Sequence, residues 1–281
     1  MKKELKIKKV LNNNVVIAQN FFRKESVLID KGIGFGKKVG DPIDASVVEK
    51  IFILQDKKEQ EQYKKLLPFL DEEFIGLMND IVYFIQSKLE NEVGEHIHIA
   101  LSDHIAFAMK RIKEGLELQN PFLLETKTLY PEEYRIATDV VKMINEQSKV
   151  TLPEAEIGFI ALHIHSATSS KSISEVSHHS RLIHELITVI EKGLSITIDK
   201  EKIDYLRLVR HLTFTIERAK TEEKVDQSKK LLDVVQEEYP LCYSVALKVI
   251  NVIQQGIKTP VDESEAVYLT LHLQRLSNKN K

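Results

Sequence analysis

Residues 104–111 read HIAFAMKR, and residues 211–218 read HLTFTIER. Each stretch has histidine first, phenylalanine fourth and arginine eighth, with small and aliphatic residues between them. A second pair follows, because residues 154–164, EAEIGFIALHI, match residues 263–273, ESEAVYLTLHL. The chain therefore contains an internal duplication, and each copy keeps two histidines in fixed frames. Four histidines retained in this way indicate histidine chemistry rather than isolated core imidazoles.

The pattern of apolar residues changes near residue 57. Residues 5–11, 15–19, 26–29 and 47–54 have the alternating, β-branched character of short strands. Farther on, apolar residues recur at spacings of three and four, which predicts amphipathic helices. Clear examples are Phe74, Leu77, Met78, Ile81 and Ile85 in one stretch and Leu206, Val209, Leu212 and Ile216 in another. The charged residues 56–62 are either a linker or the start of the first helix.

These patterns predict a multidomain protein. A small antiparallel β-sheet domain in residues 1–60 is followed by two homologous all-α helical-bundle domains, residues 65–170 and 173–281. The small residues of the stretch 167–172 suit a linker between the bundles. A sheet domain of this size has little core of its own, so it would gain stability by pairing with a second copy.

The composition is that of a globular protein of the reducing cytoplasm. The 281 residues are 43% hydrophobic and 29% charged, and one cysteine, Cys242, leaves no internal disulfide to form. No apolar run approaches the roughly 20 residues that cross a bilayer, and no secretory signal is evident. We therefore expect a cytoplasmic protein without membrane insertion.

The N-terminal region is basic although the whole chain carries a formal charge of −2. Residues 1–40 contain ten Lys and Arg residues against three Asp and Glu residues. Such a region is typical of an arm that binds a polyanion, and equally of a solvated edge that protects exposed strands. Within it, Gly32, Gly34 and Gly36 alternate with larger residues, which predicts a close approach of backbone or ligand on one sheet face.

Several stretches carry a resemblance to a known family. They are residues 9–15 (KVLNNNV), 31–41 (KGIGFGKKVGD), 103–105 (DHI), 158–164 (GFIALHI), 210–212 (RHL) and 268–272 (YLTLH). Together they resemble the BglG/SacY/LicT family of transcriptional antiterminators, which serve the bacterial sugar phosphotransferase system (PTS). In this family a co-antiterminator (CAT) RNA-binding domain precedes two PTS regulation domains (PRDs). Residues 32–38 and 96–100 are most similar to the glucose-type branch, GlcT.

The resemblance implies a homodimer that grips a leader-mRNA hairpin and so prevents termination of a PTS sugar-transport operon, with glucose as the sugar. The RNA-binding residues that it implies are Lys9, Asn12, Asn14, Lys31, Gly32, Phe35, Gly36 and Lys37. Asparagine presents a donor and an acceptor to base edges, lysine pairs with phosphate, and an aromatic ring stacks on a base. The alternative is an ordinary turn at residues 12–14 with Phe35 in the core.

One position departs from the family, which often has glycine where Asp30 stands. A negative charge beside a phosphate backbone is tolerated if the side chain points away, and is a local weakness if it does not.

The resemblance also implies phosphorylation at His104, His163, His211 and His272, with the carrier HPr and a sugar-specific enzyme II as donors. A neutral imidazole nitrogen is nucleophilic near neutral pH, which suits it to accept a phosphoryl group. We expect phosphate on the first repeat to disfavour the RNA-competent dimer. Each of these histidines, taken alone, is also compatible with a hydrogen-bonded core residue.

Two other functions are compatible with the repeats: a histidine phosphocarrier enzyme and a PTS-regulated DNA-binding activator. A phosphate relay has no use for a basic sheet rich in asparagine and glycine. An activator needs a helix-turn-helix, where the sequence predicts strands. The chain lacks a Walker loop, a nucleophile elbow and a convincing carboxylate pair, so we expect no enzyme and no catalytic residue. Histidines such as His96 and His98 follow no ligand pattern, so we expect no metal and no cofactor.

Overall fold

The structure is a computed structural model that describes residues 4–20, 25–44, 52–54, 56–90, 93–94, 96–169, 171–221 and 229–279. The chain divides into two compact units. The first unit contains residues 1–120 and 132–173, and the second contains residues 121–131 and 174–281.

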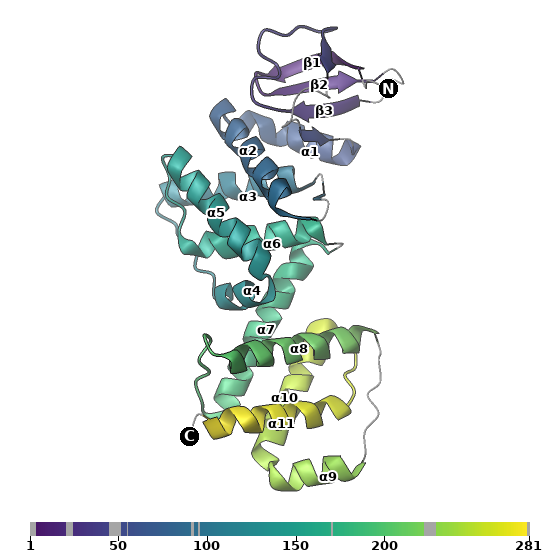
Figure 1. Cartoon of the computed structure of the whole chain (residues 1–281), viewed down its shortest axis with the longest axis vertical. Coiled ribbons are helices and arrows are strands. Elements are labelled where there is room, and N and C mark those ends of the chain that lie inside the picture. Colours follow the sequence, from purple (N-terminus) through teal and green to yellow (C-terminus); the bar gives the residue numbers. More distant parts are fainter. Residues whose placement is uncertain are drawn as a thin grey trace. The chain divides into compact units, whose positions relative to one another are not determined.

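The first unit begins with an antiparallel five-stranded sheet (Figure 1). Its strands are β1 (Glu4–Asn12), β2 (Val15–Gln19), β3 (Glu25–Ile29), β4 (Pro42–Asp44) and β5 (Phe52–Leu54), in the order β4-β1-β2-β3-β5. The predicted sheet is confirmed, and β4 is a strand that the sequence pattern did not indicate. Residues 47–51 of the last predicted strand lie outside the described residues.

The sheet has two buried faces. One carries a small cluster of its own, made of Leu5, Ile7, Val16, Ala18, Leu28 and Ile43. Side chains alternate between the faces of a strand, so Val15, Ile17 and Val27 point the other way. They are also buried, since helix α1 (Lys57–Leu66) runs across that side (Figure 1). The charged stretch after residue 56 is thus a helix start: Asp56 caps α1 by accepting hydrogen bonds from the backbone N–H groups of Lys58 and Glu59.

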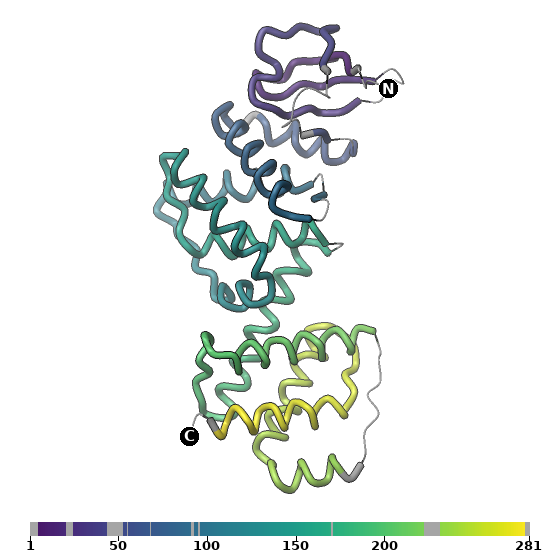
Figure 2. The backbone as a smooth tube through the Cα atoms, in the orientation of Figure 1, coloured from purple at the N-terminus to yellow at the C-terminus, as the bar shows by residue number. Residues whose placement is uncertain are grey.

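In the part of the chain that the structure describes, helices follow in two series of five. The first series consists of α2 (Glu72–Lys88), α3 (His96–Lys113), α4 (Leu123–Leu129), α5 (Pro131–Gln147) and α6 (Glu154–Thr168). The second consists of α7 (Ile173–Leu194), α8 (Ile203–Thr221), α9 (Lys229–Glu238), α10 (Pro240–Ile257) and α11 (Ser264–Lys279). A short 3-10 turn, η1 (Leu67–Phe69), links α1 to α2. Figure 2 traces this path from the sheet to the C-terminal helix. The two all-α repeats are thereby confirmed.

The repeated residues appear at equivalent places in the two series. Pro131 opens α5 and Pro240 opens α10, where a missing backbone N–H costs nothing. Pro153 directly precedes α6, and α11 begins four residues after Pro260. The predicted apolar faces are buried except at Phe74, which is partly buried, and at Leu206, which is half exposed because α8 buries Tyr205 and Leu208 instead.

Helix α4 belongs to the second unit although it lies between helices of the first series. Its Glu125 is fully buried, and the Oε1 atom lies 2.8 Å from Lys200 Nζ and 3.3 Å from His184 Nδ1. Tyr130, just after α4, bonds through its hydroxyl to His179 Nδ1 at 3.1 Å. A buried carboxylate needs such partners, so these contacts hold α4 in the second unit.

Candidate functional site

The structure brings together two separate segments of the predicted RNA surface. The turn between β1 and β2, residues 12–14, lies against the loop of residues 30–37. Gly34 N donates to Asn13 O at 2.8 Å, and Asp30 N donates to Asn14 O at 3.0 Å. A Cβ atom on Gly34 would overlap the Asn12 carbonyl oxygen, so only glycine allows this approach.

The glycine pattern does not lie on a sheet face, and that part of the prediction is wrong. Residues 31–36 form turns, with Gly32 at φ +77° and Gly36 at φ +66°. These are left-handed conformations that residues with a Cβ rarely adopt. The close approach was predicted correctly for Gly34 alone, whose neighbour is the backbone of the adjacent turn.

Six of the eight predicted RNA-binding residues are exposed: Lys9, Lys31, Gly32, Phe35, Gly36 and Lys37. Phe35 is 75% exposed, which excludes a place in the core. An aromatic ring held open between two glycines is available for stacking on a base. Lys9 pairs with Ile17 in the β1–β2 register and lines a groove together with Lys64 and Glu72, on the side of the sheet that α1 covers.

Asn12 and Asn14 use their side chains inside the protein. Asn12 Oδ1 accepts from Asn14 N at 2.9 Å. Asn14 is 7% exposed; its Oδ1 accepts from Gly32 N at 2.8 Å, and its Nδ2 donates to Glu72 O at 2.7 Å. Asn14 therefore joins the turn, the glycine loop and the first residue of α2. The sequence pattern did not single out Asn13, whose Nδ2 donates to Glu72 Oε2 at 2.8 Å.

Asp30 points inward, away from the exposed loop. It is 9% exposed, and its Oδ1 accepts from Lys31 N at 2.8 Å and from Asn79 Nδ2 of α2 at 3.2 Å. The negative charge that departs from the family pattern is thus directed at a buried amide.

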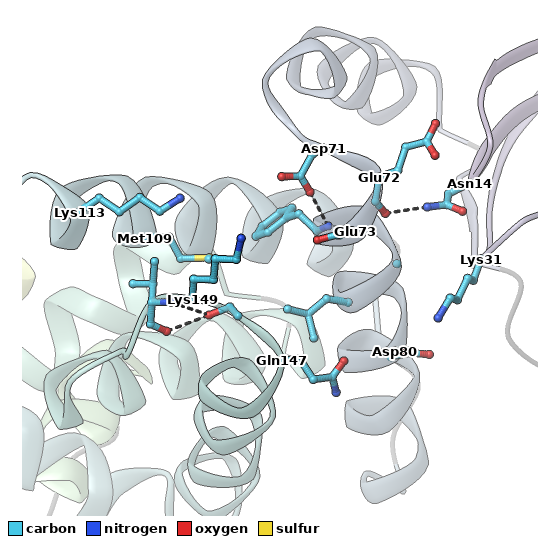
Figure 3. Close-up of a pocket in the computed structure, with 15 residues that line it drawn as sticks. Asn14, Lys31, Asp71, Glu72, Glu73, Asp80, Met109, Lys113, Gln147 and Lys149 are labelled. Carbon is cyan, nitrogen blue, oxygen red and sulfur yellow. Dashed lines mark hydrogen bonds between the residues drawn. The ribbon is translucent and has the colours of Figure 1, made fainter.

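A cavity of about 660 Å³ borders the inner side of this surface. Asn14 and Lys31 line it from the sheet domain, Glu72 and Asp80 from α2, and Lys113 from the end of α3 (Figure 3). Lys31 extends from its loop toward α2 in this view (Figure 3). Helix α3 also carries His104, so the predicted phosphorylation helix and the predicted RNA loop border one cavity.

The four predicted phosphorylation sites form two pairs. His104 of α3 and His163 of α6 have ring centroids 4.8 Å apart, and His211 of α8 and His272 of α11 have ring centroids 4.7 Å apart. In each unit two helices separated by tens of residues bring the rings together. His211 is exposed, and the other three rings are partly buried.

Each pair stands beside a buried glutamate that is bonded to an arginine, and neither residue was among the predicted site residues. Glu156 Oε1 accepts from Arg111 Nη2 at 2.6 Å, and Glu156 Oε2 lies 3.0 Å from His104 Nε2. In the second unit, Glu265 accepts from Arg218 Nε and Nη2, both at 2.7 Å. These residues belong to the repeated sequence motifs, and their identity in both copies was the signal that could have revealed them.

The surroundings of His163, His211 and His272 favour the neutral imidazole. Burial is the main cause that lowers the pKa of His163 to about 3, and nearby His104 and His96 lower it further. Burial, followed by His211 and Arg275, lowers the pKa of His272 to about 4. His211 is more open to solvent than the others, but partial burial of its ring, followed by Arg218, lowers its pKa as well. A neutral ring has a nitrogen lone pair, which nucleophilic attack on phosphorus requires.

Other histidines have structural contacts. His98 is fully buried and packs edge-on against Tyr63, with ring centroids 5.3 Å apart, and burial lowers its pKa to about 3. His165 Nδ1 lies 2.8 Å from Glu133 Oε1. Within the described ranges, no three His, Cys, Asp or Glu residues form a group that could hold a metal ion, and no helix is long and apolar enough to cross a membrane.

Comparison with known families agrees with this layout. Residues 5–61 match the CAT RNA binding domain, and residues 79–167 and 184–276 each match the PRD domain. All four paired histidines fall inside the two PRD matches, and the turn and glycine loop fall inside the CAT match.

Known proteins resemble the chain over nearly its whole length. It is 54% identical over 273 residues to the PtsGHI operon antiterminator of Bacillus subtilis, covering 97% of both chains. It is 41% identical over 276 residues to the protein GlcT of Staphylococcus saprophyticus, covering 98% of both. A crystal structure of GlcT CAT-PRDI superposes with a TM-score of 0.57 at 56% identity, covering 59% of this chain and 99% of that one. The chain therefore belongs to the BglG/SacY family of antiterminators, which joins a CAT RNA-binding domain to PRD domains, and to its glucose-type branch.

Proposed function

We propose that this protein is a cytoplasmic transcriptional antiterminator that binds a leader-mRNA hairpin of a PTS sugar-transport operon and is switched by histidine phosphorylation. The observation that carries the proposal is the convergence of the 12–14 turn and the 31–37 loop, in which Phe35 is 75% exposed. The names of the two relatives, an operon antiterminator and GlcT, support glucose as the sugar.

RNA recognition would use stacking and charge. An unpaired base stacked on Phe35 contributes about 1–3 kcal/mol. Lys9, Lys31 and Lys37 supply positive charge for phosphates, and the exposed glycine backbone lets RNA approach closely. A homodimer of sheets would grip the hairpin and keep it from rearranging into the overlapping terminator, so that polymerase continues.

Control would come from phosphate on the histidine pairs, with HPr and a sugar-specific enzyme II as donors. Two phosphates facing each other across a dimer axis, at about 8 Å and an effective dielectric of about 40, repel by about 4 kcal/mol. A complete switch between two states needs about 5.5 kcal/mol. One symmetric pair of phosphates on the first repeat therefore biases the dimer strongly against RNA binding, and sugar transport relieves the block by draining the phosphate.

The RNA-binding part is tested by titrating the full chain onto a leader RNA hairpin and onto duplex DNA at several salt concentrations. We expect binding to RNA alone, with a steep salt dependence. Phe35→Ala should weaken it about 5- to 150-fold. Val39→Ala, at a residue 70% exposed in the same loop, is the matched control and should bind normally. Equal binding to duplex DNA would instead favour a DNA-binding activator.

The regulatory part is tested with His104→Asp, which places a negative charge at the first repeat. We expect weaker dimerisation in sedimentation and weaker RNA binding in filter assays. Unchanged dimerisation and RNA affinity would contradict the proposed switch. Rapid onward transfer of phosphate from the histidines to another protein would favour a phosphocarrier.

A further inference from the structure

The two histidine sites use the same residue types but bond them differently. In the first site, Glu156 divides its oxygens between two partners: Oε1 accepts from Arg111 and Oε2 from the imidazole of His104. In the second site, both oxygens of Glu265 accept from Arg218, and Oε2 also accepts from the hydroxyl of Thr215 at 3.0 Å. The hydrogen bonds of the described residues do not include one between Glu265 and His211.

One of the positions that differ between the two motif copies carries a hydroxyl that bonds the glutamate. Thr215 stands four residues after His211, and its counterpart four residues after His104 is Ala108. Residues four apart lie on the same face of a helix, so position 108 or 215 faces the same glutamate as the histidine does. Both positions are buried, at 0% and 5% exposure. The hydroxyl of Thr215 donates to Oε2 of Glu265. In the first site, the corresponding oxygen of Glu156 is bonded to the imidazole of His104.

The arginines of the two sites also bond their glutamates differently. Arg218 binds Glu265 through two nitrogens, which is the fork geometry that guanidinium groups prefer with carboxylates. Arg111 binds Glu156 through Nη2, and its Nε is buried with no hydrogen-bond partner among the described residues. The bond from His104 to Glu156 is thus formed where a second arginine bond is missing.

We propose that Ala108 and Thr215 decide whether the buried glutamate orients the first histidine of each repeat, so that His104 is an oriented phosphoacceptor and His211 is not. This inference rests on the proposed phosphorylation. An ionised carboxylate only accepts hydrogen bonds, so Glu156 holds a proton on His104 Nε2 and leaves the lone pair on Nδ1. Ala108 and Thr215 are positioning residues, since they act on the histidine through the glutamate.

The transfer step balances in this arrangement. The Nδ1 lone pair of His104 forms the new N–P bond while the N–P bond of a phosphohistidine or phosphoramidate donor breaks, and the donor nitrogen keeps that electron pair. The accepting ring becomes positively charged, with its proton still on Nε2. Glu156 faces that proton and stabilises the charge as it develops, whereas Glu265 is already occupied by Arg218 and Thr215.

The first test measures tautomers by long-range proton–nitrogen NMR of the histidine rings in the full chain, with signals assigned from His104→Gln and His211→Gln. We expect His104 to hold its proton on Nε2 and His211 to average over both tautomers. Ala108→Thr should let the ring proton of His104 average over both nitrogens. Thr215→Val, which keeps the shape of the side chain and removes the hydroxyl, should fix the ring proton of His211 on Nε2. Unmoved signals in both variants would overturn the inference.

A matched control exchanges the same residue types two positions earlier. Thr213 bonds through its hydroxyl to Val209 O at 2.9 Å, away from the glutamate, and Ala106 is its counterpart. Ala106→Thr and Thr213→Val should leave the tautomers of both histidines unchanged. If they shift the signals as strongly as the exchanges at 108 and 215, the effect is a general disturbance of the helix and the inference fails.

The second test measures phosphorylation with phosphoramidate, which needs no protein partner, followed by phosphorus NMR. We expect His104 to react about tenfold faster than His211, Ala108→Thr to slow His104, and Thr215→Val to accelerate His211. Uptake of phosphate with rates that ignore both exchanges would overturn the inference and leave the proposed function standing. Tautomers that follow the exchanges without any uptake would instead contradict the proposed phosphorylation.

Discussion

Asn14 Nδ2 lies 2.7 Å from the backbone carbonyl oxygen of Glu72, so a residue predicted to read RNA is bonded to the first residue of α2. Its Oδ1 is bonded to Gly32 N on the opposite side. Both polar atoms of the amide are therefore used to hold the RNA turn, the glycine loop and the first regulatory repeat in one arrangement.

Asn14→Ala should lower both stability and RNA affinity. It leaves Gly32 N and Glu72 O without their partner, at a cost of about 1–3 kcal/mol in unfolding free energy. Urea unfolding followed by circular dichroism measures this cost. Asn12→Ala loses one partly exposed bond to Asn14 N and should cost less. An Asn14→Ala protein with normal stability and reduced RNA affinity would mean that the amide turns outward to read a base.

Gly34→Ala should disrupt the RNA surface without removing any polar group. The added methyl overlaps the Asn12 carbonyl oxygen, so the turn and the loop must separate. We expect a loss of about 1–3 kcal/mol of stability and a fall in RNA affinity. Phe35→Ala should weaken RNA binding with stability unchanged to within about 0.5 kcal/mol, since its side chain is exposed. Normal RNA affinity in Gly34→Ala would show that the two segments act independently.

Asp30→Ala should destabilise the protein without improving RNA binding. The carboxylate accepts from Asn79 Nδ2 and Lys31 N, so its removal takes away both hydrogen bonds, at a cost of about 1–3 kcal/mol. Filter binding on the RNA hairpin measures whether RNA affinity stays the same or falls. Clearly tighter binding would mean that the charge of Asp30 acts on the phosphate backbone after all.

Arg111→Met should be strongly destabilising, because it leaves Glu156 as a buried carboxylate without its guanidinium partner. Breaking a buried ion pair from one side costs about 3–5 kcal/mol. The double variant Arg111→Met with Glu156→Met should recover most of that loss in the same urea assay. Lys142→Ala, which breaks an exposed pair with Glu146, is the control and should cost less than about 1 kcal/mol. A small effect of Arg111→Met would show that water reaches Glu156.

Acidification should weaken the fold in part through His163. Burial lowers its pKa to about 3, so between pH 6.5 and pH 3 the unfolded chain binds a proton that the folded chain does not. His163 therefore does not lower the free energy of unfolding above about pH 6.5, and it lowers this free energy progressively as the pH falls below that value. From pH 7 to pH 5 the loss is about 2 kcal/mol. In urea unfolding, His163→Gln should lose correspondingly less unfolding free energy between pH 7 and pH 5 than the unaltered protein. An equal loss would mean that other groups cause the pH dependence.

The sequence alone was sufficient for the broad organisation. The period of the apolar residues distinguishes strands from helices, and it predicted the β-sheet followed by two helical repeats. The duplication marked His104, His163, His211 and His272 as a set. Both signals are local or internal to the sequence, so they need no knowledge of packing.

The contacts between distant segments depended on the tertiary structure. Only packing of α3 against α6 and of α8 against α11 shows that the histidines form pairs, and that Glu156 bonds His104 while Glu265 does not bond His211. The turn residues Asn12 and Asn14 and the loop around Gly34 were separate motifs until the fold placed one against the other. The physical reason is that residue type and spacing set local conformation, whereas the partner of a side chain is chosen by the complete arrangement of backbone, volume and hydrogen bonds around it.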